Sequence, residues 1–150
     1  MPSSTYLDVT DFGATGDGTT DDTTAIQNAI NHASNNNIQT IFFPDGHYKF
    51  STLYFYYDLT LNPGFENTEN RDGRFQLRGT GRLSINDLRN YDGTNTDRLY
   101  GAVLESTGDG ILVETAGSLQ SSRNFVAKNL SFVANNTSCP GMTFDQCSFK

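Results

Sequence analysis

Apolar and polar residues alternate in short stretches along this chain, and the spacing between apolar residues becomes helical once, near the N-terminus. Residues 6–12 alternate as a short, half-buried strand does. Three glycines fall within residues 13–18, which predicts a tight, exposed turn with positive φ angles. The spacing is helical from Thr20 to Ser34, and residues 38–43 return to a strand pattern. The N-terminal part is therefore predicted to contain a strand, a glycine turn, one helix and a second strand.

The predicted helix combines an acidic start with one apolar face. Thr20 is placed to cap it, and Asp21 and Asp22 fall in the first turn, where carboxylates meet the positive end of the helix dipole. The apolar face consists of Ala25, Ile26, Ala29, Ile30 and Ala33. Two adjacent carboxylates also suggest an acid/base pair, but neighbouring helical side chains point in different directions. We therefore assign Asp21 and Asp22 a structural role.

The rest of the chain is predicted to form many short strands separated by turns. Pro44-Asp45-Gly46 predicts a turn, and β-type residues continue to Leu61, where Asn62-Pro63-Gly64 ends the stretch. Residues 75–85 alternate again, whereas residues 86–100 are polar and are expected to be a loop or insertion. The later apolar runs are Ala102–Leu104, Ile111–Val113, Phe125–Ala127, Leu130–Val133 and Met142–Phe149.

A short internal echo suggests stacked coils. Leu130-Ser131-Phe132 returns as Cys147-Ser148-Phe149, so Leu130 would lie over Cys147 in a solenoid, although chance alternation would give the same pattern. No polar capping segment precedes Lys150, and we expect further chain or another subunit to cover that end.

A dense motif near the N-terminus runs Val-Thr-Asp-Phe-Gly-Ala-Thr-Gly-Asp-Gly-Thr-Thr-Asp-Asp-Thr-Thr-Ala-Ile-Gln over residues 9–27. It resembles the start of pectate-lyase-like proteins, a superfamily that includes polygalacturonases and phage tailspikes. The Pro-x-Gly-x-Tyr turn at residues 44–48, the Leu-Arg-Gly-Thr-Gly element at residues 77–81 and the segment Phe125–Phe132 extend the likeness.

The resemblance implies an all-β solenoid: the start of a right-handed parallel β-helix with an N-terminal capping α-helix. The capping helix would occupy residues 20–34 and the coils would begin near residue 38. Residues 1–150 would then be the N-terminal part of a single β-helix domain that continues beyond residue 150.

Composition and charge exclude several classes of protein. The formal net charge is −7, and the one cluster of arginines, Arg71, Arg74, Arg78 and Arg82, is diluted by acidic residues. We therefore expect no nucleic-acid partner and no membrane insertion. No apolar run reaches the roughly 20 residues of a membrane-spanning helix, and the N-terminus lacks the apolar core of a signal peptide.

Metals and cofactors are not expected. The two cysteines, Cys139 and Cys147, have no histidine nearby and supply too few ligands for zinc. A disulfide between them is one interpretation, and a small core residue at Cys147 is the simpler one.

The candidate chemistry is that of polysaccharide cleavage, which usually needs two carboxylates. The catalytic signature of polygalacturonases is absent, and Asn95-Thr96-Asp97, which matches its first element, lies in a polar stretch without partners. Glu105, Asp109 and Glu114 lie near consecutive strands and are the candidate catalytic acids, with a solvated face as the alternative. His32 and His47 are isolated and are expected at the surface.

Three tyrosines are the candidate carbohydrate contacts. Tyr54, Tyr56 and Tyr57 form the densest aromatic group, and sugars stack on flat rings with polar tips. Packing between subunits, or against the body of the solenoid, is the alternative.

Three functions follow from the resemblance. The first is a homotrimeric phage tailspike-type protein, in a virion tail or outside the cell, whose partners are a host surface polysaccharide and other phage tail proteins. The second is an extracellular polysaccharide hydrolase or lyase of the polygalacturonase type. The third is a non-catalytic structural adaptor of a phage tail.

Overall fold

The described part of the molecule consists of two parallel sheets and a single α-helix. The computed structural model describes residues 6–56, 76–81, 101–114, 126–134 and 142–144. Sheet A contains β1 (Leu7–Asp8), β3 (Thr40–Phe43), β5 (Gln76–Gly79) and β7 (Val126–Lys128) in that order. Sheet B contains β2 (Asp17–Asp21), β4 (Gly46–Tyr56), β6 (Ala102–Glu114) and β8 (Leu130–Ala134), and β9 (Met142–Phe144) also pairs with β6.

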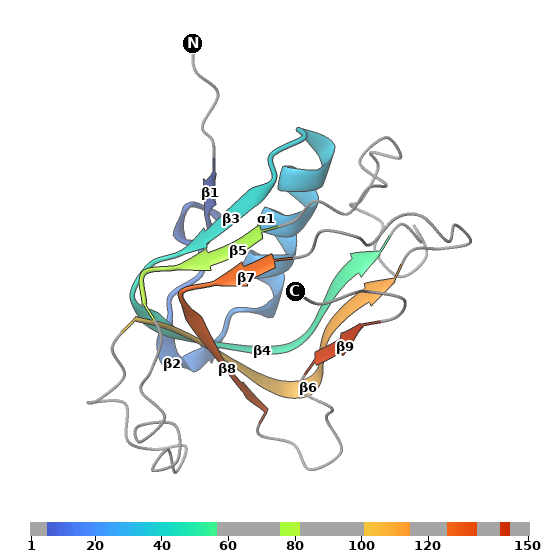
Figure 1. Ribbon diagram of the computed structural model, residues 1–150. Helices are drawn as coiled ribbons and strands as arrows, with labels where there is room; N and C mark the ends of the chain where they lie inside the picture. The colour runs from blue at the N-terminus through green and yellow to red at the C-terminus, as the bar shows by residue number, and fades with distance from the viewer. Residues whose placement is uncertain (1–5, 57–75, 82–100, 115–125, 135–141, 145–150) are drawn as a thin grey trace.

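The chain passes from one sheet to the other in regular alternation (Figure 1). Each strand of sheet A is followed by a strand of sheet B, and every described strand pair is parallel. From β1 to β8, each passage thus adds one strand to each sheet, and the new strand lies beside the one added before, whereas β9 lies beside β6. This confirms the prediction of repeated parallel strands with one helix.

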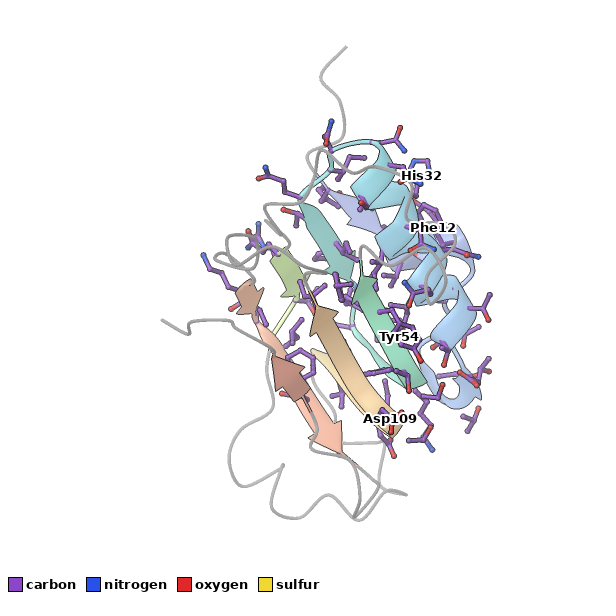
Figure 2. The ribbon with its side chains drawn as sticks, turned by 90° about the vertical axis from the view of Figure 1, so that its right-hand side faces the viewer. Phe12, His32, Tyr54 and Asp109 are labelled. Carbon is purple, nitrogen blue, oxygen red and sulfur yellow. The ribbon has the colours of Figure 1, made fainter. Side chains whose placement is uncertain are left out.

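The core lies between the two sheets and is closed on one side by α1 (Thr23–Asn35). The helix packs against β3, β4 and the short 3-10 helix η1 (Val9–Phe12), and Figure 2 shows it at the side of the strands opposite β8. The fully buried residues of the helix and strands include Ile26, Ala29, Ile30, Ala33, Ile41, Phe43, Tyr48, Phe50, Leu53, Leu77, Leu104 and Ile111. The apolar helix face was predicted correctly, with Ala25 only partly buried.

The helix begins later than predicted because the residues before it have other partners. Thr20 lies in β2, which pairs with β4, and the first turn of α1 contains no acidic residue. Asp22 is at the N-cap position but makes no side-chain capping bond. Its carboxylate turns back to the glycine loop, where it accepts hydrogen bonds from the Thr15 N–H at 2.8 Å and the Gly16 N–H at 3.0 Å.

The glycine loop and the Pro-x-Gly-x-Tyr turn are one packed unit. The Tyr48 ring lies against Gly16, where an added Cβ would come within 2.8 Å of the ring carbons, and Gly16 has a φ of 60°. The His47 N–H donates to the Gly16 carbonyl at 2.8 Å. Burial, together with the nearby carboxylates of Asp8, Asp22 and Asp45, raises the pKa of the Tyr48 phenol, which donates to the Pro44 carbonyl. Only glycine leaves room for the ring at this position.

Two predicted elements differ in the structure. Residues 9–12 form η1 instead of continuing a strand, because Asp8 accepts a hydrogen bond from the Thr10 N–H and Gly13, with a φ of 95°, ends the turn. The apolar runs at 102–104 and 111–113 are two halves of the single strand β6. The register between β4 and β6 shifts between Phe50 and Thr52, where the two strands bend.

Some predicted features lie outside the described residues. They include the stretch beyond Tyr56, the loop at residues 86–100, and both cysteines. The echo between Leu130 and Cys147 is therefore untested, although Leu130 itself lies beside Ala102 of the preceding strand in sheet B.

Candidate functional site

The candidate acid Glu105 is buried and bonded to His47. Glu105 lies in β6 and His47 in β4, both on the face of sheet B opposite the core residues Tyr48 and Phe50. The Glu105 side chain has no exposed surface, that of His47 is 4% exposed, and their Oε2 and Nε2 atoms are 2.5 Å apart. The solvated-face interpretation is therefore wrong for Glu105, as is the surface placement of His47. His32 is exposed as predicted, with its ring 5.4 Å from that of Phe12.

The other two candidate acids do not join Glu105. Asp109 is exposed at the bend of β6, where its N–H donates to the Thr52 hydroxyl at 3.1 Å. Glu114 ends β6 opposite Tyr56, and its side chain lies outside the described residues. Glu105 is therefore buried and Asp109 is exposed to solvent. These two residues do not form the pair of accessible carboxylates that glycoside hydrolysis uses.

The candidate tyrosines have a partial structural explanation. Tyr54 is half-buried beside α1 (Figure 2). The Gln27 side chain bonds to both backbone groups of Tyr54, donating to its carbonyl and accepting from its N–H, each at 2.8 Å. Tyr54 thus lies in the segment that attaches the helix to sheet B. The side chains of Tyr56 and Tyr57 lie outside the described residues.

The acidic residues around the glycine loop are engaged in local hydrogen bonds. Bonds from the backbone N–H groups of Thr20 and Thr19, and from the Thr20 hydroxyl, hold the pKa of Asp17 well below its usual range. The Thr23 hydroxyl and N–H similarly lower the pKa of Asp21. Each of these carboxylates fixes a turn, as does Asp22. The contacts therefore agree with the structural role predicted for Asp21 and Asp22. The predicted reason, attraction to the positive end of the helix dipole, is wrong, because the first turn of α1 contains no acidic residue.

A groove on the outer face of sheet A was not predicted from the sequence. It has a volume of about 420 Å³ and is lined by Tyr6, Thr40, Phe42 and Arg78. Phe42 and Arg78 are register partners in β3 and β5. Strand alternation indicates that both face away from the core, since Ile41 and Leu77 are buried. Their proximity depends on pairing between strands far apart in the chain.

Two negative observations apply to the described residues. No group of three or more His, Cys, Asp or Glu side chains among them could hold a metal ion. No helix in the same part of the chain is long and apolar enough to cross a membrane.

Comparison with known proteins assigns the chain to a family. The model of the family described as rhamnogalacturonase A/epimerase, pectate lyase-like, matches residues 6–96. The chain belongs to this family. Its matched region contains the glycine loop, α1, and the strands that form the groove on sheet A.

A solved viral protein has a similar fold. ORF18 of Geobacillus virus E2 matches with a TM-score of 0.55 and 22% sequence identity, and the match covers 95% of this chain. It covers 22% of the viral chain, so the present chain corresponds to a minor part of that protein. No curated protein matches the chain. At this identity the likeness to ORF18 concerns the fold alone.

Proposed function

We propose that the chain is the N-terminal part of a phage tailspike-type protein that binds host surface polysaccharide and, in its full-length form, cleaves it. The proposal depends on one observation: the chain belongs to a pectate lyase-like family. The name of that family describes enzymes that act on polysaccharides. The viral origin of the similar protein ORF18 supports a place in a virion tail.

The proposed architecture is a right-handed parallel β-helix. The alternation between sheets A and B supports it, since each passage of the chain adds one strand to each sheet. In this proposal α1 caps the first coil, and it packs against β3 and β4. Further coils would follow residue 150, and three copies would associate side by side.

The second candidate function is that of a structural adaptor in a phage tail. The burial of Glu105 favours it over an active site in this part of the chain, because a carboxylate with no exposed surface cannot reach a substrate. An extracellular hydrolase or lyase of the polygalacturonase type is the third, and it shares the family evidence.

The decisive experiment incubates the full-length protein with surface polysaccharide from candidate hosts and measures both retention of the polysaccharide and release of new chain ends. We expect retention, release of chain ends, and a trimer by light scattering. We also expect the 150-residue chain alone to release no ends. Retention without release would favour the adaptor, and a monomer that releases ends would favour a non-viral enzyme. A protein that retains no polysaccharide would contradict the proposal.

A further inference from the structure

We propose that one edge of β4 is a strand-addition site for a second copy of this chain, and that the Gln27 side chain holds α1 over it and keeps it closed. The site is the backbone of residues 51–56 on the side that faces the helix. This inference goes beyond the proposed function, because it needs no sugar. It also differs from a side-by-side trimer, because the contact joins backbone edges in pairs.

The first observation is that the second half of β4 has a helix, and no described strand, along one edge. β2 pairs with β4 at His47 and Lys49, and β2 ends at Asp21, opposite Lys49. β4 continues to Tyr56, and over this stretch it pairs with β6 on its other side. The remaining edge lies beside α1 (Figure 2). A strand edge without a neighbouring strand is a template on which another chain can pair.

The second observation is that side chains of α1 occupy the backbone groups that an added strand would use. The Gln27 Nε2 donates to the Tyr54 carbonyl at 2.8 Å, and the Gln27 Oε1 accepts from the Tyr54 N–H at 2.8 Å. A side-chain amide has the same donor and acceptor as a peptide group, so Gln27 takes the place of one residue of a neighbouring strand. One turn earlier, the Thr23 hydroxyl accepts from the Ser51 N–H at 2.9 Å.

The third observation is that this edge is complementary to itself. Residues 51–56 read Ser-Thr-Leu-Tyr-Phe-Tyr and contain no charged residue, proline or glycine, although the chain as a whole has a net charge of −7. Short segments of this kind pair with identical segments. Tyr54 directs both of its backbone groups to the same edge, and two such residues exchange both hydrogen bonds in an antiparallel pair. Two copies related by a two-fold axis can therefore join Tyr54 to Tyr54.

The helix controls access to the edge because it lies where the second strand would lie. Ile26 and Ile30 are fully buried beneath the helix, and they favour the closed form together with the bonds of Gln27 and Thr23. A local opening of α1 would expose the edge, and pairing with a second copy would stabilise the open form by mass action. Loss of the Gln27 bonds should therefore cause association that increases with protein concentration.

The test uses the full-length protein and the variant Gln27→Leu, which keeps a side chain of similar size but removes both bonds to Tyr54. Light scattering over a range of concentrations should show that the mass of the variant rises to about twice that of the wild type, because a two-fold contact joins copies in pairs. The wild type should keep its mass over the same range. Hydrogen exchange should show that the Tyr54 amide is protected in the associated variant, because it then donates to the other copy.

Two controls separate opening of this edge from other causes of association. Asn28→Leu adds the same apolar side chain at an exposed position of α1. Gly79→Ala should destabilise the fold through its close contact with Asn129, in sheet A and away from this edge. Both variants should keep the wild-type mass. Thr23→Val removes the acceptor of the Ser51 N–H and should also associate, so it provides the test if Gln27→Leu does not fold.

Thermal melting identifies the variants that are folded. The inference is overturned if folded Gln27→Leu and Thr23→Val keep the wild-type mass at every concentration. Equal association of Asn28→Leu or Gly79→Ala would also overturn it, as would an associated Gln27→Leu whose Tyr54 amide exchanges freely. Each of these results leaves the proposed recognition of polysaccharide intact, because that is measured by retention of the polysaccharide.

Discussion

Single carboxylates in this protein have roles that depend on what surrounds them. Asp22 is buried and bonded to two backbone N–H groups of the glycine loop, Asp17 is exposed and fixes a turn, and Glu105 is buried with His47. The sequence showed all three as acidic residues near turns or strands. The burial of Asp22 and Glu105 involves residues far away in the chain, such as Lys49 and His47, and the spacing of acidic residues does not specify it.

Replacing Asp22 should destabilise the fold. Asp22→Ala removes a buried carboxylate and leaves the N–H groups of Thr15 and Gly16 without their acceptor. We therefore expect a loss of about 2–3 kcal/mol in the free energy of unfolding. Urea unfolding measures this loss. The control is Asp11→Ala, an exposed position in the same segment, which should change the stability by less than about 0.5 kcal/mol. Equal effects of the two variants would show that the loop does not need this carboxylate.

Replacing Glu105 should lower the stability of the fold, because its partner His47 then stays buried without a carboxylate. Glu105→Ala removes one member of a buried pair, and such a change costs roughly 3–5 kcal/mol. Glu105→Gln should cost less, because the amide keeps a hydrogen bond to His47. Denaturant unfolding distinguishes these from Asp109→Ala, which alters an exposed side chain and should be near neutral. If Glu105→Gln kept the full stability but abolished release of chain ends by the full-length protein, Glu105 would be catalytic after all.

At the scale of elements, close approach between successive passages of the chain depends on small residues. Gly79 ends β5, and a Cβ there would lie 2.4 Å from the carbonyl oxygen of Asn129 and 2.8 Å from the Cβ of Ala102. Asn129 itself has a φ of 56° at the corner between β7 and β8. The corner of one passage therefore sits directly against the end of the strand before it.

A pair of glycine variants tests this contact. Gly79→Ala should lower the free energy of unfolding by about 1–3 kcal/mol, because the added methyl group overlaps backbone atoms that cannot move freely. Gly81→Ala, two residues on, should be neutral or slightly stabilising, since the nearest atom to its Cβ is 3.8 Å away and alanine restricts the unfolded chain. Thermal or urea unfolding compares the two. If the two variants lost stability equally, close packing at Gly79 would not be the cause.

At the scale of the whole molecule, stability should be greatest where strands are flanked on both sides. β4 lies between β2 and β6, and β6 lies between β4 and the strands β8 and β9. The register of β4 with β6 is also the longest in the described part of the structure. The edges, by contrast, are formed by short strands such as β1.

Amide hydrogen exchange should reproduce this order. We expect the slowest exchange at the amides of β4 and β6 and exchange faster by an order of magnitude or more in β1, because local opening at an edge exposes fewer buried contacts. Exchange of the intact chain followed by NMR gives the rates. Uniform protection across all strands would contradict the prediction, as would faster exchange in β4 than in β1.

Local patterns in the sequence were sufficient for the elements and the family. The apolar face of α1, the positive φ angles in the glycine loop and the repeated short strands all follow from interactions within a few residues, and the motif at residues 9–27 lies in the region that matches the family. Tertiary structure decided which residues are buried and which meet. The start of α1, the union of two apolar runs in β6, the burial of His47 with Glu105, and the groove between Phe42 and Arg78 depend on register between distant strands. A one-residue change of register reverses the face of every side chain in a strand, and no local pattern specifies that register.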